Sequence, residues 1–238
     1  MNIYAHRGAS EYAPENTFSA FYLGLIQGAN GIETDIRLTK DNVPVLFHDE
    51  TLMRVTGETG KVSDYTMDEL KEFKVRGNTT ADFFDRIVTL REFLSVFGKY
   101  NINFALELKD KGLESVVLSL VNEYRVVNNS TITSFDYEKI KIIREKCDYI
   151  KIGWLVDSDG VKEIERLKKI SGEVMCPKAS EVTAESVELL KNAGFLVRPW
   201  GVVNVELMKK MCEFGVDGMP VNFPDRLFQY VNTVKSNS

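Results

Sequence analysis

Short apolar segments with strand character alternate with amphipathic helical patterns along most of this 238-residue chain. In the second half, the stretches 158–170, 183–193 and 204–214 follow a helical period, and Gly194 and Gly215 stand where helix C-caps belong. The segments expected to be parallel strands are 3–6, the one starting at residue 31, 103–109, 131–135, 149–153, 173–177, 196–200 and 217–220. Eight such strands, each followed by a helix or a long loop, are typical of a (β/α)8 TIM barrel. A doubly wound open sheet is the alternative, but no G-x-G-x-x-G follows the first strand to favour it.

A polar hairpin at residues 31–49 interrupts this alternation. Its turn at 40–42 is too short for a parallel crossover, so the chain after the turn must return as an antiparallel arm. Counting residue pairs outward from the turn brings His48 level with Glu33 or Asp35, within a residue or two. The hairpin therefore places two carboxylates and an imidazole close together.

A polar excursion at about 50–86 follows the hairpin and contains one short helical pattern, 67–73. We interpret it as a small insertion after the second strand, and the whole of 1–238 as a single TIM-barrel domain. The length and the 44% apolar content are sufficient for one large core.

Bulk composition excludes some partners. The formal net charge is −5, with no Lys/Arg run, which argues against a nucleic-acid surface. Cys147, Cys176 and Cys212 stand singly, as expected of buried thiols in a reducing compartment. No leader pattern is present, and no apolar run approaches the ~18 residues of a membrane span. We therefore expect a cytoplasmic protein without stable membrane insertion, and we make no prediction of its oligomeric state.

Polar and aromatic residues occur where the predicted strands end, which is the end of a TIM barrel that carries function. They are His6 and Arg7 after the first strand, Glu33 and Asp35 in the second, Glu107 and Lys109 in the third, Phe135 in the fourth and Trp200 in the seventh. For Trp200 and Phe135, ordinary core packing is the alternative to a substrate contact.

The carboxylates in this group predict a metal site. Glu33 and Asp35 stand at i and i+2, so both lie on one face of their strand. With Glu107 they supply three hard oxygen ligands for one divalent cation, Mg²⁺ or Ca²⁺, and the absence of a Cys/His cluster argues against a structural zinc site. The alternative is a buried ion pair of Glu33 and Asp35 with Arg7 or Lys109, which is costly without a ligand.

The two histidines of the chain, His6 and His48, both fall in these segments. Imidazole has an unperturbed pKa near ~6.5, so it can give or take a proton at neutral pH, and phosphodiester cleavage needs one group of each kind. Arg7 offers planar bidentate donors and Lys109 a point charge, the two ways in which proteins hold a phosphoryl group. A hydrogen-bonded structural histidine is the alternative for each.

Taken together, these motifs resemble the glycerophosphodiester phosphodiesterases over almost the whole chain. The matching residues are His6-Arg7-Gly8, Pro14-Glu15-Asn16-Thr17, Glu33-x-Asp35, Thr39, Asp41, Val45, His48-Asp49, Glu107-x-Lys109, Trp200 and Gly215-Val216-Asp217-Gly218 before Pro224. The resemblance implies a TIM barrel with a divalent cation, in which the metal ligands are Glu33, Asp35 and Glu107, the acid and base are His6 and His48, and the phosphate-binding residues are Arg7 and Lys109. It also implies that the hairpin and the 50–86 excursion form the small insertion of this family.

Two segments depart from the family pattern. Where the family usually has Trp-Thr-Val-Asn, this chain has Trp200-Gly201-Val202-Val203, with Asn204 one place late. Where the family usually has Thr-Asp before the last proline, this chain has Val221-Asn222-Phe223. Both departures bear on substrate preference more than on catalysis.

The expected reaction is hydrolysis of a small glycerophosphodiester to glycerol 3-phosphate and an alcohol, by way of a cyclic phosphate; the resemblance implies choline or ethanolamine as alcohols. A lysophospholipase D or another phospholipase is the first alternative, and an apolar groove at the mouth of the site would favour it. The second is a non-catalytic phosphate-binding barrel, which should lack a histidine or a carboxylate. A TIM-barrel isomerase or aldolase would need a reactive lysine such as Lys151 or Lys178, and neither has supporting partners in the sequence.

Overall fold

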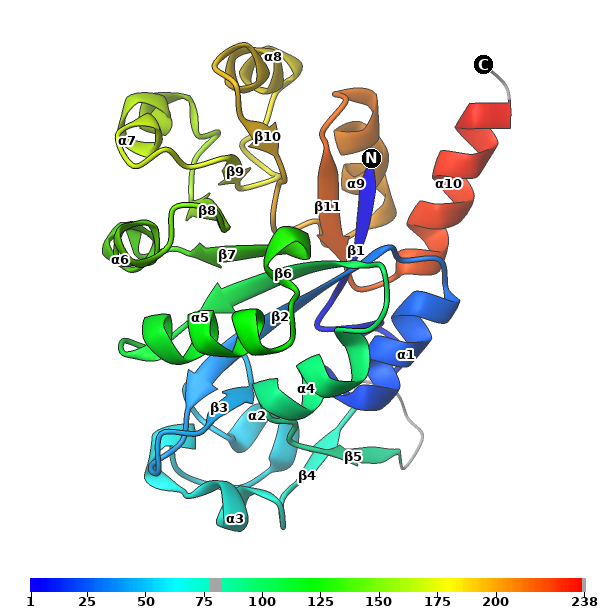
Figure 1. The fold of residues 1–238 in the computed structure, drawn as a ribbon. Helices are drawn as coiled ribbons and strands as arrows, with labels where there is room; N and C mark the ends of the chain where they lie inside the picture. The colour runs from blue at the N-terminus through cyan, green and yellow to red at the C-terminus, as the bar shows by residue number, and fades with distance from the viewer. Residues whose placement is uncertain (78–82, 237–238) are drawn as a thin grey trace.

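A barrel of parallel strands forms the centre of the computed structural model, which describes residues 1–77 and 83–236 (Figure 1). The strands are β1 (Asn2–His6), β2 (Gly31–Leu38), β6 (Asn103–Leu108), β7 (Ser130–Ser134), β8 (Lys151–Val156), β9 (Val174–Pro177), β10 (Leu196–Val197) and β11 (Gly218–Val221). Their neighbour order is β10-β9-β8-β7-β6-β2-β1-β11. The predicted (β/α)8 fold is therefore confirmed, and the doubly wound sheet is wrong.

The barrel is nearly closed, because β10 and β11 meet through Asp217 instead of a full ladder. The amide of Asp217 donates to the Val197 carbonyl at 2.9 Å, and the amide of Val197 donates to Asp217 Oδ2 at 2.8 Å. The strand predicted at 196–200 ends early, at Val197. The amides of Arg198 and Trp200 donate to β9 at 3.0 Å each, so the alternating nitrogen of Pro199, which has no hydrogen, faces β11.

Helices surround the strands, as the alternating pattern predicts (Figure 1). They are α1 (Phe18–Ile26), α4 (Leu90–Phe97), α5 (Leu113–Glu123), α6 (Tyr137–Lys146), α7 (Ile164–Lys168), α8 (Ala184–Asn192), α9 (Val205–Glu213) and α10 (Pro224–Ser236), with 3-10 turns η2 (Val127–Asn129) and η3 (Val161–Glu163). Asp136 caps α6 by accepting from the Glu138 amide at 3.0 Å, which confirms the predicted N-cap. Gly194 and Gly215 follow α8 and α9 with φ of 95° and 73°. The pattern analysis did not identify α10.

Aromatic packing fixes the strand that carries Glu107. Phe21 of α1 and Phe97 of α4 are fully buried around Phe93, whose ring centroid lies 5.7 Å from that of Phe104 on β6. Burying each such ring stabilises the fold by roughly 1.5–3 kcal/mol. The cluster therefore holds β6 in place against two helices.

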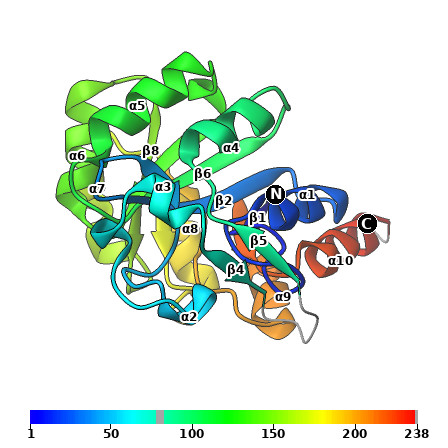
Figure 2. The same ribbon diagram turned by 90° about the horizontal axis from the view of Figure 1, so that it is seen from below.

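The chain between β2 and α4 forms the insertion, which lies beside β2 and α4 (Figures 1 and 2). Its elements are β3 (Pro44–Leu46), α2 (Met53–Thr56), η1 (Val62–Asp64), α3 (Met67–Leu70), β4 (Lys74–Arg76) and β5 (Phe84–Arg86). β3 runs antiparallel to β2 with Leu46 opposite Ile36, as the predicted hairpin requires.

The interpretation of 50–86 as a polar excursion with one helix is incomplete. The helix predicted at 67–73 ends at Leu70, and β4 and β5 form an antiparallel hairpin that the pattern did not indicate. Apolar residues of the insertion form a core separate from that of the barrel. Their irregular spacing in the sequence follows neither a helical nor a strand period, so the pattern did not indicate this core. It comprises Val45, Phe47, Leu52, Val55, Val62, Met67, Leu70, Val75 and Ile87. Residues 78–82 of the predicted insertion lie outside the described residues.

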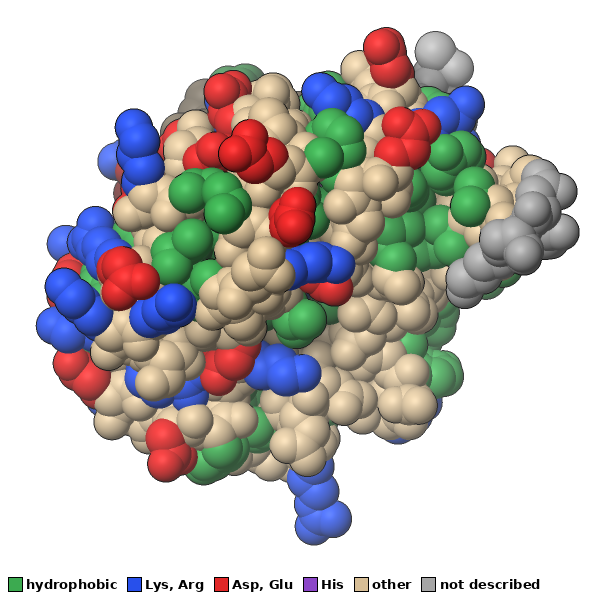
Figure 3. Space-filling view, turned by 90° about the horizontal axis from the view of Figure 1, so that it is seen from above, with side chains coloured by type: hydrophobic (Ala, Val, Ile, Leu, Met, Phe, Trp, Pro, Cys, Tyr) green, Lys and Arg blue, Asp and Glu red, His purple; other side chains and the backbone are tan. Residues whose placement is uncertain are grey.

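The surface seen from above carries acidic and basic side chains interspersed with small apolar groups (Figure 3). Within residues 1–77 and 83–236, no helix combines the length and the apolar character that crossing a membrane requires.

Candidate active site

The residues predicted to form a site meet at the carboxyl ends of the strands, around one cavity of about 270 Å³. The parallel register sets His6 of β1 beside Glu33 of β2, and Asp35 of β2 beside Glu107 of β6. The predicted residues that line the cavity are His6, Arg7, Glu33, His48, Glu107, Lys109, Phe135 and Trp200. Asp35 is nearly inaccessible, with 1% of its surface exposed, and joins them through the carboxylate cluster.

Three buried carboxylates form that cluster. Glu33, Asp35 and Glu107 each place one oxygen so that all three oxygens lie within 4.8 Å of one another. Burial and the neighbouring Asp35 charge raise the pKa of Glu107 to about 7, and the same causes raise the pKa of Glu33 well above its usual range. Without a cation, the cluster therefore holds protons at neutral pH that ordinary carboxylates would release.

Asp35 behaves differently from its two neighbours. Burial opposes its ionisation, but the charges of Lys109 and Arg7 outweigh burial and hold the pKa of Asp35 well below its usual range. Lys109 Nζ lies 3.1 Å from Asp35 Oδ1, and Arg7 Nε lies 3.1 Å from Oδ2. The ion pair considered as the alternative to a metal site is thus present at Asp35, whereas Glu33 Oε2 lies 3.8 Å from Nε2 of His6.

The donor set fits a hard divalent cation. Asp35 Oδ1 is buried and, despite the nearby Lys109 charge, accepts no hydrogen bond from the described residues. An unsatisfied buried carboxylate oxygen is unfavourable, and a cation shared with Glu33 and Glu107 would satisfy it. These three carboxylates could therefore hold a metal ion.

A strained turn after β1 positions Arg7. Arg7 has a φ of 56°, in the left-handed region, and its amide donates to Glu33 at 2.9 Å to the carbonyl and 3.2 Å to Oε2. Gly8 follows with a φ of 86°, and a Cβ there would lie 2.4 Å from the carbonyl carbon of Ala20. Glycine at position 8 therefore lets α1 pack directly beneath the site.

His6 is held by an amide side chain. Its Nδ1 lies 2.6 Å from Asn222 Oδ1. Because an amide oxygen can only accept a hydrogen bond, Nδ1 carries the hydrogen. Nε2 is therefore the basic nitrogen, and it faces Glu33. Burial, with the Arg7 charge as a second cause, lowers the pKa of His6 to about 4. In the metal-free protein His6 is thus neutral at pH 7.

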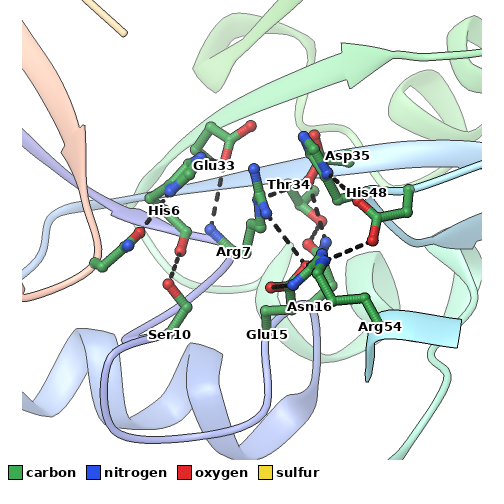
Figure 4. A network of polar contacts seen from close by, with 12 residues as sticks. His6, Arg7, Ser10, Glu15, Asn16, Glu33, Thr34, Asp35, His48 and Arg54 are labelled. Atoms are coloured by element: carbon green, nitrogen blue, oxygen red, sulfur yellow. Dashed lines mark hydrogen bonds and ion pairs between the residues drawn. The ribbon is translucent and has the colours of Figure 1, made fainter. Parts of the chain in front are cut away.

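His48 is held by a carboxylate in a longer chain of contacts (Figure 4). Its Nδ1 lies 2.7 Å from Asp49 Oδ1, and Asp49 Oδ2 accepts from Arg54 Nε at 2.5 Å. Arg54 of α2 also binds both oxygens of Glu15 at 2.7 Å, and Glu15 accepts from Arg7 at 3.2 Å. Burial lowers the pKa of His48, so it too is neutral at pH 7, and its Nε2 has no hydrogen-bond partner among the described residues.

An aromatic wall faces the carboxylates across the cavity. Phe135, which follows β7 and is 40% exposed, packs edge-on against Trp200 with ring centroids 5.0 Å apart. Trp200 is fixed by its Nε1, which donates to the Val156 carbonyl at 2.9 Å. Both aromatic residues thus lie where the sequence predicted them, at the mouth of the site.

The pattern analysis did not identify all residues of this network. Asn222 appeared only as a departure from the family pattern, yet it contacts His6 from 216 positions away. Arg54 was not singled out at all, since one arginine in a polar insertion has no distinguishing signal. Lys151, proposed for an isomerase, begins β8 at the opposite end of the barrel.

Comparison with known proteins places this geometry in a family. A model of the glycerophosphoryl diester phosphodiesterase family matches residues 6–226. A glycerophosphodiester phosphodiesterase of Caldanaerobacter subterraneus subsp. tengcongensis is 32% identical over 96% of this chain and 97% of its own length.

Solved structures agree with this match. The crystal structure of a glycerophosphodiester phosphodiesterase from Agrobacterium tumefaciens is 25% identical, has a TM-score of 0.84, and is matched over 96% of this chain and 99% of that one. A phosphodiesterase from Oleispira antarctica, in complex with its product sn-glycerol 3-phosphate, is 26% identical with a TM-score of 0.83, over 98% and 97% of the two chains. The chain therefore belongs to the glycerophosphoryl diester phosphodiesterase family and is a phosphoric diester hydrolase that acts on glycerophosphodiesters.

Proposed function

We propose that this hydrolase converts glycerophosphodiesters to glycerol 3-phosphate and an alcohol, with His6 and His48 as its acid–base pair. The observation that carries the proposal is that both imidazoles, each with its Nδ1 engaged, line the cavity that holds the carboxylate cluster. Each neutral imidazole can accept a proton at its Nε2. An imidazolium formed in this way beside the anionic phosphate can then donate that proton. The family excludes the isomerase, and the retained histidines and carboxylates argue against a silent barrel.

Glu33, Asp35 and Glu107 are the proposed ligands of one divalent cation, Mg²⁺ or Ca²⁺. When bound, such a cation would neutralise charge on the phosphate and acidify a nearby hydroxyl. Arg7 and Lys109 would then share Asp35 with the cation, and their positive charges would be available to the phosphate oxygens.

The proposed route begins with attack by the 2-hydroxyl of the substrate's own glycerol. One histidine removes the hydroxyl proton as the oxygen bonds to phosphorus. The other, which has first taken up a proton from water beside the anionic phosphate, gives that proton to the alcohol oxygen as its bond to phosphorus breaks. Water then opens the cyclic phosphate with the two histidines in exchanged roles. An internal hydroxyl held beside phosphorus has a large effective concentration, which favours this route over direct attack by water.

A lysophospholipase D-type activity is the second candidate. An apolar rim supports it, since Phe135 and Val203 at the cavity are 40% and 73% exposed. Such a rim could contact one acyl chain of a lysophospholipid.

A substrate panel tests these proposals. Glycerophosphodiesters and the matching lysophospholipids should be assayed with Mg²⁺ or Ca²⁺ and with chelator. We expect cation-dependent release of glycerol 3-phosphate from the deacylated diesters. Faster turnover of the lysophospholipids would favour the second candidate, and full activity in chelator would contradict the metal assignment.

A diester whose glycerol 2-hydroxyl is replaced by hydrogen tests the cyclic route. At saturating concentration we expect its turnover to be lost, because the internal nucleophile is gone. Near-normal turnover would contradict the cyclic intermediate and indicate water as the nucleophile.

A further inference from the structure

Arg198 is a buried cation to which the proposed chemistry assigns no role. It follows β10, where Leu196, Arg198 and Trp200 alternate along the inner side of the barrel. Leu196 lines a cavity of about 60 Å³ at the amino end of the strands, Trp200 lines the catalytic cavity, and Arg198 lines both. Arg198 therefore lies between the two cavities, at the floor of the active site, with only 7% of the residue exposed.

No carboxylate of the described residues forms an ion pair with Arg198. Its polar partners are the Cys176 thiol, at 3.8 Å from Sγ, and the side chain of Tyr4, whose ring centroid lies 5.0 Å from the guanidinium. Burial raises the pKa of the Cys176 thiol, so Cys176 supplies no negative charge. A buried cation without a counterion is unfavourable, which indicates that an anion from outside the chain completes this site.

The charges around the cavity also indicate what enters it. Among the described residues, the acidic side chains lining the cavity are Glu33 and Glu107, and both belong to the metal cluster. The aromatic wall is already faced by cations, because Lys178 lies 5.7 Å from the Trp200 ring centroid and Lys109 lies 5.9 Å from that of Phe135. This wall therefore disfavours a quaternary ammonium group, which seeks free aromatic faces.

We propose that Arg198 binds an anionic group, a carboxylate or a phosphate, on the alcohol half of the diester substrate. The inference rests on the proposed function, in which the glycerol hydroxyls lie at the metal cluster. The alcohol then extends toward the opposite wall, where Arg198 and Trp200 lie. A guanidinium matches both oxyanions through paired N–H donors. The preferred alcohols are thus acidic ones, in contrast to the choline or ethanolamine that the family resemblance implies.

Two diesters that differ by a single carboxylate test this proposal. Glycerophosphoserine and glycerophosphoethanolamine share the amine and the phosphodiester, and only the serine compound offers Arg198 an anion. We expect the wild type to show a kcat/KM about 10- to 100-fold higher for the serine compound, as for a hydrogen-bonded charge. Equal or lower efficiency with it would overturn the proposal without any variant.

Substitutions of Arg198 then assign the preference. Arg198→Met should reduce the efficiency with glycerophosphoserine to that with glycerophosphoethanolamine, and Arg198→Lys should retain part of the ratio. Lys151→Gln also removes one positive charge, but at the exposed amino end of β8, and should leave the ratio unchanged. If Arg198→Met lowered both efficiencies by the same factor, Arg198 would serve the fold, the common phosphate or a permanently bound inorganic anion, and the proposal would be wrong.

Calorimetric binding separates this inference from the proposed reaction. Both diesters can be titrated into His48→Ala with Mg²⁺ or Ca²⁺ present, so that cleavage does not interfere. The serine compound should bind more tightly, and adding Arg198→Met should abolish the difference. Absence of turnover in the wild type would contradict the proposed function, and equal affinities would contradict the role of Arg198.

Discussion

The two walls of the catalytic cavity differ in how completely the protein satisfies their charges. On the wall built from β1, β2 and β6, each ionised group has a protein partner: Arg7 and Lys109 pair with Asp35, and Arg54 pairs with Glu15 and Asp49. On the opposite wall, from β7 to β10, the aromatic pair Phe135 and Trp200 stands above Arg198, which has no carboxylate partner among the described residues.

This difference separates chemistry from recognition. A wall whose groups orient one another holds reacting atoms in fixed positions, which catalysis requires. A wall with apolar surface and a buried cation that lacks a carboxylate partner among the described residues has free energy available for a ligand. Substitutions on the first wall should therefore change the rate on every substrate, and substitutions on the second should change the choice among substrates.

Removing the metal ligands should have the largest effect. Glu33→Gln and Glu107→Gln should each lower cation-dependent activity more than about 100-fold, because loss of even an outer partner of a ligand costs about 10- to 100-fold. Neither change should destabilise the metal-free protein, since each relieves repulsion in the cluster.

Asp35→Asn should lose activity as well, but it should also unfold more easily, because Arg7 and Lys109 would lose their buried counterion; breaking such a pair costs about 3–5 kcal/mol. Chemical denaturation in chelator, beside Glu33→Gln as the control, measures this contrast. Equal stability of the two variants would mean that Asp35 is not the electrostatic centre of the wall.

Loss of either histidine should come next. His6→Ala and His48→Ala should each reduce kcat by roughly 10²- to 10⁴-fold, as expected for loss of a general acid or base. A nitrophenyl diester needs little protonation of its leaving group, so it should restore the rate only in the variant that lacks the acid. Equal rescue of both variants, or of neither, would argue against divided roles.

The raised pKa of Glu107 gives a prediction for stability. Folding holds its pKa near 7 against 4.5 when unfolded, so the folded state keeps a proton that the unfolded state releases between these values, and stability falls as pH rises through this range. His6 acts in the opposite direction, because its pKa falls from 6.5 to about 4. The two contributions overlap, and a single stability profile cannot resolve them.

Glu107→Gln separates the two contributions, since it removes one and leaves the other. In chelator, the variant should gain on the order of 3 kcal/mol relative to the wild type between pH 4.5 and 7. Denaturant unfolding at several pH values measures this difference in the free energy of unfolding. Adding Mg²⁺ or Ca²⁺ should stabilise the wild type and so remove the advantage of the variant. A difference that does not vary with pH would contradict the raised pKa.

The sequence predicted those features of the site that depend on a repeating geometry. The strand period of two placed Glu33 beside Asp35, and the short turn brought the chain back so that the Phe47 amide donates to the Asp35 carbonyl and His48 follows at the site. Asn222 and Arg54 have no such rule, because each reaches the site from a distant segment through one side chain. The sequence does not predict the environment of Arg198 either. That this side chain is buried without a carboxylate partner among the described residues can be seen only once the neighbouring strands are assembled.

The smallest predicted effect concerns Arg54, which links the insertion to the catalytic wall. Its side chain is 44% exposed, so solvent weakens its ion pairs, yet it bridges Glu15 and Asp49 and thereby orients His48. Arg54→Gln should lower kcat about 10-fold with little change in KM, because outer partners of this kind contribute about 10- to 100-fold and this one is partly solvated. Arg54→Lys should recover part of the rate, since it keeps the charge but not the two-pronged contact with Glu15.

Lys61→Gln is the matched control for Arg54. Lys61 is a cation of the same insertion, and its Nζ lies 2.7 Å from Glu50 Oε1. This pair does not line the catalytic cavity, so loss of Lys61 should leave kcat unchanged. Steady-state kinetics of the three variants on one diester, with melting temperatures, distinguish orientation of His48 from stability of the insertion. If Arg54→Gln raised KM and left kcat intact, the insertion would contribute to binding, and the separation of the two walls into chemistry and recognition would not hold at α2.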